Sequence, residues 1–136
     1  FTHKVVELLL DHKPACPNVF GGVAHSCWAS KPFCPPVACS QKHYPERDVD
    51  YDFLAVDPGT DRRCWHYMQG AFYFLSRDFA ARVAGGSEEW RERDRHGWPE
   101  DSSTGFAVNS YGHEKKSCVA GINLHGDKQG RLDHKR

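Results

Sequence analysis

The stretch G-A-F-Y-F-L-S-R-D-F-A-A-R-V-A, residues 70–84, carries the clearest structural signal in this sequence. Aromatic residues dominate its first six positions, a composition typical of a β-strand over residues 70–75. Ser76 follows at a position where serine can cap a helix, and Gly85 and Gly86 can end that helix. A strand that leads directly into a helix favours the α/β class.

The alternation of apolar strands and helix-like segments continues on both sides of this stretch. We expect strands at residues 18–24, 51–56 and 119–125, and helices at residues 3–12 and 102–111. The first of these strands, N-V-F-G-G-V-A, contains a glycine pair at which backbone or ligand can approach closely. The whole pattern predicts an α/β domain.

The irregular parts of the chain do not indicate a boundary between domains. Residues 24–45 are rich in Cys and Pro and predict one long loop, and residues 126–136 predict a polar tail. A densely charged segment, S-E-E-W-R-E-R-D-R-H-G, is expected to be solvated. The 136 residues therefore fit a single domain or part of a larger one.

Charge and cysteine content exclude some classes of partner and favour one compartment. The 18 basic and 18 acidic residues balance, so no global field draws the chain onto nucleic acid or an anionic membrane. No apolar run approaches the roughly 18 residues of a membrane-spanning helix. The six cysteines favour disulfides in an oxidising compartment, although their pairing is not readable from the sequence.

Two adjacent carboxylates, Glu100 and Asp101, stand in W-P-E-D-S-S-T-G at residues 98–105, just before the expected helix. From spacing alone, Asp101 is an N-cap that accepts hydrogen bonds from the first free N–H groups. Such donors favour the ionised carboxylate, which also suits a base that takes a proton from a hydroxyl. Glu100 is then a neighbour that orients a substrate, or a surface acid.

Other candidate residues also have a structural interpretation, which the local sequence favours for His125 and Lys128 and which is at least as good for Trp65 and Tyr67. His125 ends the last expected strand and can bind a metal, and Lys128 can meet a phosphate, but both also fit an ordinary surface. Trp65 and Tyr67 can stack on a sugar ring or simply pack in a core.

A zinc site is a further possibility in the cysteine-rich loop. Its candidate ligands are Cys27, Cys34, Cys39 and His43. The spacing is looser than in paired C-x-x-C motifs, so disulfides remain the favoured interpretation of these cysteines.

Taken in order, these motifs resemble the β-1,3-glycosyltransferases, the galactosyltransferase and fringe-like group. G-A-F-Y-F-L-S followed by R-D-F-A is similar to the family's glycine-aromatic strand and L-S-R-D helix start, and P-E-D-S-S-T-G is similar to its E-D-V-x-x-G element. H-K-V-V-E-L-L-L-D, N-V-F-G-G-V-A and K-H-Y-P follow the family's order upstream. The resemblance covers roughly residues 1–112, with G-I-N-L-H-G-D-K as a looser match.

The resemblance implies the C-terminal, acceptor-side part of a GT-A (Rossmann-like) domain, with a mixed sheet and flanking helices. It implies an inverting enzyme that moves a sugar from a UDP-sugar to a glycan or glycoprotein hydroxyl in a β-1,3 linkage, in the Golgi lumen. Asp101 corresponds to the base. On the acceptor side lie Glu100, Trp65, Tyr67, Gly70 and Ala71.

The implied cofactor is Mn²⁺ or another divalent cation. His125 corresponds to a metal ligand and Lys128 to a contact of the donor phosphates. The resemblance places the family's D-x-D carboxylates, and the nucleotide-binding half that carries them, ahead of Phe1 and so outside this chain. We therefore expect these 136 residues to be inactive alone.

One departure from the family and one competing class remain. Ser102 stands where the family usually has valine, at a packed position. The competing hypothesis is a non-enzymatic α/β module, pinned by disulfides or zinc, that binds a glycan or protein through Trp65, Tyr67 and the cysteine-rich loop.

Overall fold

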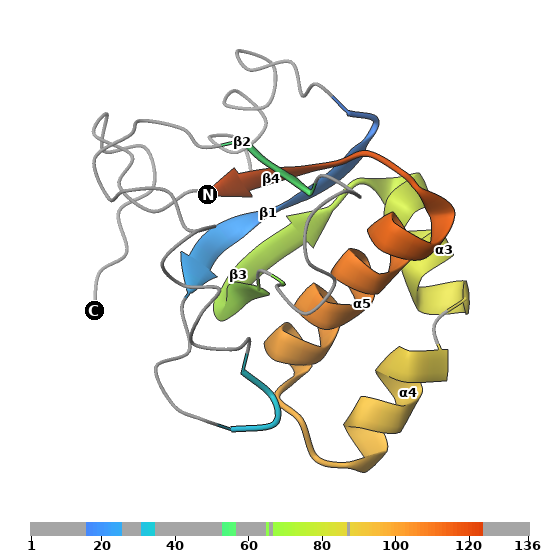
Figure 1. Cartoon of the computed structure of the whole chain (residues 1–136). Coiled ribbons are helices and arrows are strands. Elements are labelled where there is room, and N and C mark those ends of the chain that lie inside the picture. Colours follow the sequence, from blue (N-terminus) through green and yellow to red (C-terminus); the bar gives the residue numbers. More distant parts are fainter. Residues whose placement is uncertain are drawn as a thin grey trace.

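The computed structural model describes residues 16–25, 31–34, 53–56, 65, 67–86 and 88–123. Within them the elements follow the order β1 (Asn18–His25), β2 (Phe53–Val56), β3 (Tyr67–Leu75), α3 (Arg77–Gly86), α4 (Glu88–Arg95), α5 (Glu100–Lys115) and β4 (Val119–Asn123) (Figure 1). The helix expected at residues 3–12, most of the loop at 24–45 and the tail at 126–136 lie outside the described residues.

The described strands form one mixed sheet in the order β2-β4-β1-β3. β1 and β4 run parallel, with Asn18 opposite Val119, whereas β2–β4 and β1–β3 are antiparallel. The predicted α/β class with a mixed sheet is confirmed in this part of the chain. The strand predictions are also confirmed, although β3 begins at Tyr67 rather than Gly70.

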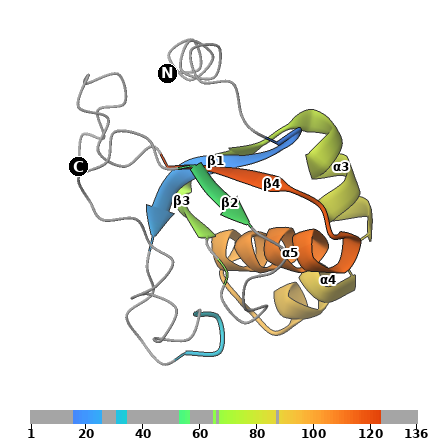
Figure 2. The ribbon, with the colours of Figure 1, turned by 45° about the horizontal axis from the view of Figure 1, so that its top comes forward.

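The helices α5 and α3 pack on the sheet, and α4 packs on α5. Figure 2 shows α5 next to the sheet and α4 on its far side, and contacts join α5 to β3 and α4 to α5. Apolar side chains from both layers meet in the core, which comprises Phe20, Met68, Phe79, Val83, Ala107, Val108 and Val119. The segment expected to be merely solvated forms α4, and none of its residues is buried.

The helix α5 is longer at both ends than residues 102–111. It begins at Glu100, directly after Pro99, and continues to Lys115, so the expectation that Gly112 stops it is wrong. Gly112 is instead buried within the last turns of the helix. Lys116 reverses the chain in the left-handed region at φ 47°, and the Ser117 N–H closes the end by donating to the Gly112 carbonyl at 2.9 Å.

A bulge interrupts β3 where it faces β1. Gly22 pairs with Tyr73 and Ala24 pairs with Met68, so residues 69–72 of β3 stand opposite the single residue Val23. Extra residues on one strand leave part of its backbone outside the ladder of hydrogen bonds. Within this stretch, the Gly70 N–H donates to a side chain of α5 instead of to β1.

A disulfide joins the starts of the two parallel strands. Cys16 and Cys118 precede β1 and β4, and their Cα atoms lie 5.6 Å apart. The register Asn18–Val119 immediately follows, so the covalent link and the strand pairing hold the same two segments together. This bond supports the disulfide interpretation of two of the six cysteines.

Candidate active site

Asp101 lies where the first turn of α5 meets the bulge of β3. It is the second residue of the helix, and Pro99 occupies the N-cap position without any capping hydrogen bond from a side chain. The expectation that Asp101 is the N-cap is therefore wrong, because the extended backbone of Pro99, at ψ 138°, already leads into the helix. The Asp101 carboxylate remains at the positive end of the helix dipole.

Two backbone amides fix the direction of this carboxylate. Oδ2 accepts a hydrogen bond from the Gly70 N–H at 3.0 Å, and Oδ1 accepts one from the Ser102 N–H at 2.7 Å. Gly70 belongs to the bulge, which explains why its N–H is free to leave the sheet. Each carboxylate oxygen can accept more than one hydrogen bond, so the half-buried group keeps capacity for a ligand hydroxyl.

Glu100 also bonds to β3, but its partner there is a side chain and not a backbone amide. The Tyr73 hydroxyl donates to Glu100 Oε1 and also lies 3.5 Å from Thr104 Oγ1. The Trp90 Nε1–H of α4 donates to Thr104 Oγ1 at 3.4 Å. Sequence reasoning missed Tyr73, Thr104 and Trp90, because their link to the acid pair arises only when β3, α4 and α5 pack together.

Tyr67 lies close enough to Asp101 for the charge of that carboxylate to act on its phenol. Burial, followed by the negative charge of Asp101, raises the pKa of the Tyr67 phenol from 10.0 to about 12. The phenol therefore stays neutral across the physiological range, and the ring is only 5% exposed.

Trp65 belongs to an aromatic cluster beside the site. Its ring stacks on Trp98 and meets Phe106 edge-on, with centroids 6.3 and 5.1 Å away. The guanidinium of Arg93 covers the Phe106 ring at 3.5 Å. Trp65 is 6% exposed, which leaves little ring face for stacking on a sugar. Ala71 lies in the bulge, but its side chain is outside the described set.

The structure accounts for the polar residue at position 102. Ser102 is buried, and its hydroxyl donates to the Phe33 carbonyl. Lys31 and Cys34 close the turn that contains Phe33 through a backbone hydrogen bond of 2.9 Å. A serine here thus ties part of the cysteine-rich loop to the helix that carries Asp101, which a valine cannot do.

Most residues predicted to bind a metal lie outside the described part of the chain, and the zinc candidate Cys34, which is described, is disulfide-bonded instead. His125, Lys128 and the zinc candidates Cys27, Cys39 and His43 lie outside the described residues. Among the residues that are described, no three His, Cys, Asp or Glu side chains gather to hold a metal ion. The described site therefore does not fit a cation by itself. The sequence also contains an alternating acidic run, D-V-D-Y-D at residues 48–52, which likewise lies outside the described residues.

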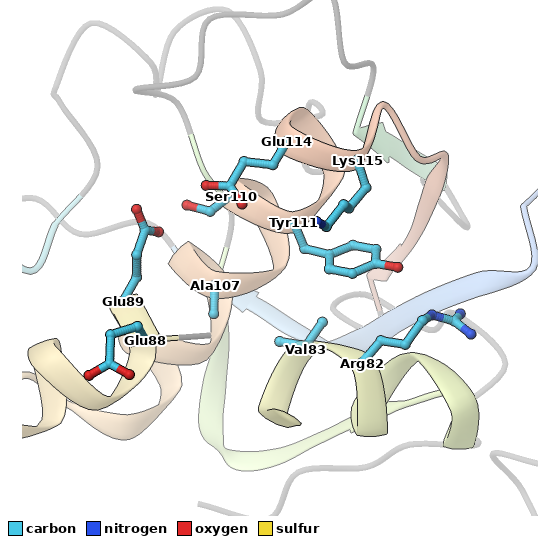
Figure 3. Close-up of a pocket in the computed structure, with 9 residues that line it drawn as sticks. All are labelled: Arg82, Val83, Glu88, Glu89, Ala107, Ser110, Tyr111, Glu114 and Lys115. Atoms are coloured by element: carbon cyan, nitrogen blue, oxygen red, sulfur yellow. The ribbon is translucent and has the colours of Figure 1, made fainter. Parts of the chain in front are cut away.

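A separate cavity of about 310 Å³ lies among α3, α4 and α5 (Figure 3). Its walls include Val83, Ala107 and Tyr111, with Arg82 and Lys115 towards one end. None of the residues singled out from the sequence lines it. At the other end, Glu88 already pairs with Arg91 and Arg95 at 3.5 and 3.2 Å.

No protein family, curated protein or solved structure matches the chain. No helix among the described residues is long and apolar enough to cross a membrane. The function of the chain is therefore inferred from the site and from the motif resemblance.

Proposed function

We propose that this chain is the acceptor-side part of an inverting GT-A glycosyltransferase, with Asp101 as its general base. The observation that carries the proposal is the pair of amide hydrogen bonds that aim the Asp101 carboxylate across the junction of α5 and β3. A general base must be oriented and accessible to its substrate. The two amides orient the Asp101 carboxylate, and the residue is only half buried. The order of the G-A-F-Y-F-L-S-R-D and P-E-D-S-S-T-G motifs adds support.

The proposed reaction is a single displacement. An acceptor hydroxyl gives its proton to Asp101 while its oxygen forms a bond to the anomeric carbon of the donor sugar. The bond from that carbon to the nucleoside diphosphate breaks, and its electron pair leaves with the diphosphate. Attack from the opposite face inverts the anomeric configuration. Gly70 and Ser102 contribute by keeping the Asp101 carboxylate in one orientation.

The proposal also includes a donor-binding side, but the residues that would form it lie outside the described part of the chain. UDP-sugar as donor, Mn²⁺ as cofactor, His125 as a metal ligand and Lys128 as a phosphate contact follow from the motif resemblance alone. A secretory compartment accords with the Cys16–Cys118 disulfide. The burial of Trp65 and Tyr67 counts equally against the binding-module alternative and against their role as acceptor contacts, because both hypotheses use these two residues.

The decisive variant is Asp101→Asn in the full-length protein, assayed for transfer from UDP-sugars to a panel of glycan acceptors with Mn²⁺. Removing a general base typically lowers turnover about a hundredfold to ten-thousandfold. We expect that loss in kcat, with donor binding by calorimetry unchanged.

Asp78→Asn is the matched control, because Asp78 is also the second residue of a helix, α3, and is exposed. It should transfer sugar at the unmodified rate. Normal turnover by Asp101→Asn would remove Asp101 as the base, and absence of transfer by the unmodified protein with every donor would overturn the proposed function.

A further inference from the structure

We propose that Tyr73 is a positioning residue for Glu100 and that Glu100, so held, contacts the acceptor glycan through a hydroxyl other than the attacking one. The inference rests on the proposed function and extends it to the second carboxylate of the pair. It comes from the chain of hydrogen bonds that links α4, α5 and β3 at the rim of the site.

The direction of that chain is fixed by chemistry. An indole N–H can only donate, so Trp90 donates to the Thr104 oxygen. The Thr104 hydroxyl proton is then available to the Tyr73 oxygen, and the Tyr73 proton goes to Glu100, an acceptor-only group when ionised. Every donor in the relay points towards Glu100, and successive hydrogen bonds of this kind polarise one another.

The relay begins in well-packed surroundings. Thr104 is 8% exposed, and the half-buried Tyr73 ring meets Phe20 of the core edge-on with centroids 6.2 Å apart. Glu100, at the other end, is exposed. A long surface glutamate normally samples many rotamers, so a rigid donor beneath it reduces the entropy lost when a ligand binds.

The two carboxylates are consequently held in different ways. Asp101 is held by two backbone amides, whereas Glu100 is held by the hydroxyl of one side chain, Tyr73. Because Glu100 is an acceptor, it suits the hydroxyl and amide donors of a glycan. If it contacts the bound acceptor but not the transferred proton, its displacement raises the KM for acceptor while leaving kcat close to normal.

The test is a double-mutant cycle of Tyr73→Phe and Glu100→Ala in the full-length protein, because alanine, unlike glutamine, leaves no oxygen to accept from the phenol. Loss of a hydrogen bond to a charged group predicts about a tenfold to hundredfold rise in acceptor KM for Tyr73→Phe, with kcat and donor KM unchanged. In the Glu100→Ala background, Tyr73→Phe should add little, because both changes remove one interaction. Thr104→Val should show a smaller rise, and Thr104→Ser, which keeps the hydroxyl, should restore the normal value.

Tyr111→Phe is the control, since it removes a phenol from a ring that is also half buried and packs edge-on against Phe79 at 5.5 Å. It should leave acceptor KM unchanged. An unaltered acceptor KM in folded Tyr73→Phe, or fully additive effects in the cycle, would overturn this inference while leaving the role of Asp101 intact. Failure of the proposed function would instead appear as no transfer by the unmodified protein.

Discussion

Tyr67 shows how the surroundings of a single side chain change its chemistry. The phenol is buried with the Asp101 carboxylate nearby, and both burial and that negative charge disfavour the tyrosinate form. A lone tyrosine in the sequence gives no sign of this effect. Its consequence is a measurable dependence of stability on alkaline pH.

Below about pH 10, Tyr67 is neutral in both the folded and the unfolded chain and contributes no pH dependence. Between 10.0 and about 12, the unfolded chain loses this proton while the folded protein retains it. The contribution of Tyr67 to the free energy of unfolding should therefore fall as pH rises through this window. Denaturant unfolding at a series of pH values should show a shallower decline for Tyr67→Phe than for the unmodified protein, and an identical slope would contradict the burial of the phenol.

The acid pair was visible in the sequence at residue scale, but its partners were not. Asp101 and Glu100 stand out because two carboxylates precede a helix. Nothing local predicts that one meets the Gly70 amide and the other the Tyr73 phenol, since these residues lie 31 and 27 positions away. The N-cap prediction for Asp101 failed because Pro99 took that position.

At the scale of the elements, β3 is the strand that organises the site. Its aromatic composition predicted a strand, and the strand is present. The bulge at residues 69–72 was not predictable, because it follows from the register with β1 rather than from β3 alone. The same bulge presents Gly70 to Asp101, so the irregular part of the strand is the part that serves the site.

Close packing beside the bulge gives a test of this register. A Cβ added at Gly22 would lie 2.8 Å from Met68 Cβ and 2.9 Å from the Phe72 carbonyl oxygen, atoms that cannot move without the strand. Gly22→Ala should therefore lower the free energy of unfolding by about 1–3 kcal/mol. Urea denaturation with linear extrapolation measures the change.

Gly70→Ala is the matched comparison from the bulge itself. The nearest atom to its added Cβ is Asp101 Oδ2 at 3.4 Å, an ordinary contact. Its effect should stay within about 1 kcal/mol. Equal destabilisation by the two substitutions would show that β1 and β3 do not approach each other in this register.

At the scale of the whole molecule, the fold class could be predicted from the sequence, but the strand order and the disulfide pairing could not. Alternating strands and helices predicted an α/β domain, whereas the order β2-β4-β1-β3 depends on long-range pairing that leaves no local signal. Six cysteines indicated disulfides without indicating which ones. The structure joins Cys16 to Cys118 across a sequence separation of 102 residues.

A link that closes so long a loop restricts the unfolded chain strongly. Replacing both Cys16 and Cys118 by serine should lower the free energy of unfolding by about 2–4 kcal/mol. Thermal denaturation with and without reductant measures the loss. Reductant should destabilise the unmodified protein by breaking the Cys16–Cys118 bond, and this part of its effect should be missing from the double variant. Unchanged stability of the double variant would show that strand pairing alone holds β1 and β4 together.

The position of β4 also has a consequence for biosynthesis. β4 lies between β1 and β2, yet it is the last of the described elements along the chain, and its parallel partner is the first. During translation, β1 emerges from the ribosome long before residues 119–123 are synthesised. The edge of β1 that pairs with β4 is therefore unpaired during this time. Such exposed edges are where nascent chains associate with one another. The nascent chain therefore exposes this edge of β1 until β4, the last of the described strands, is released and pairs with it.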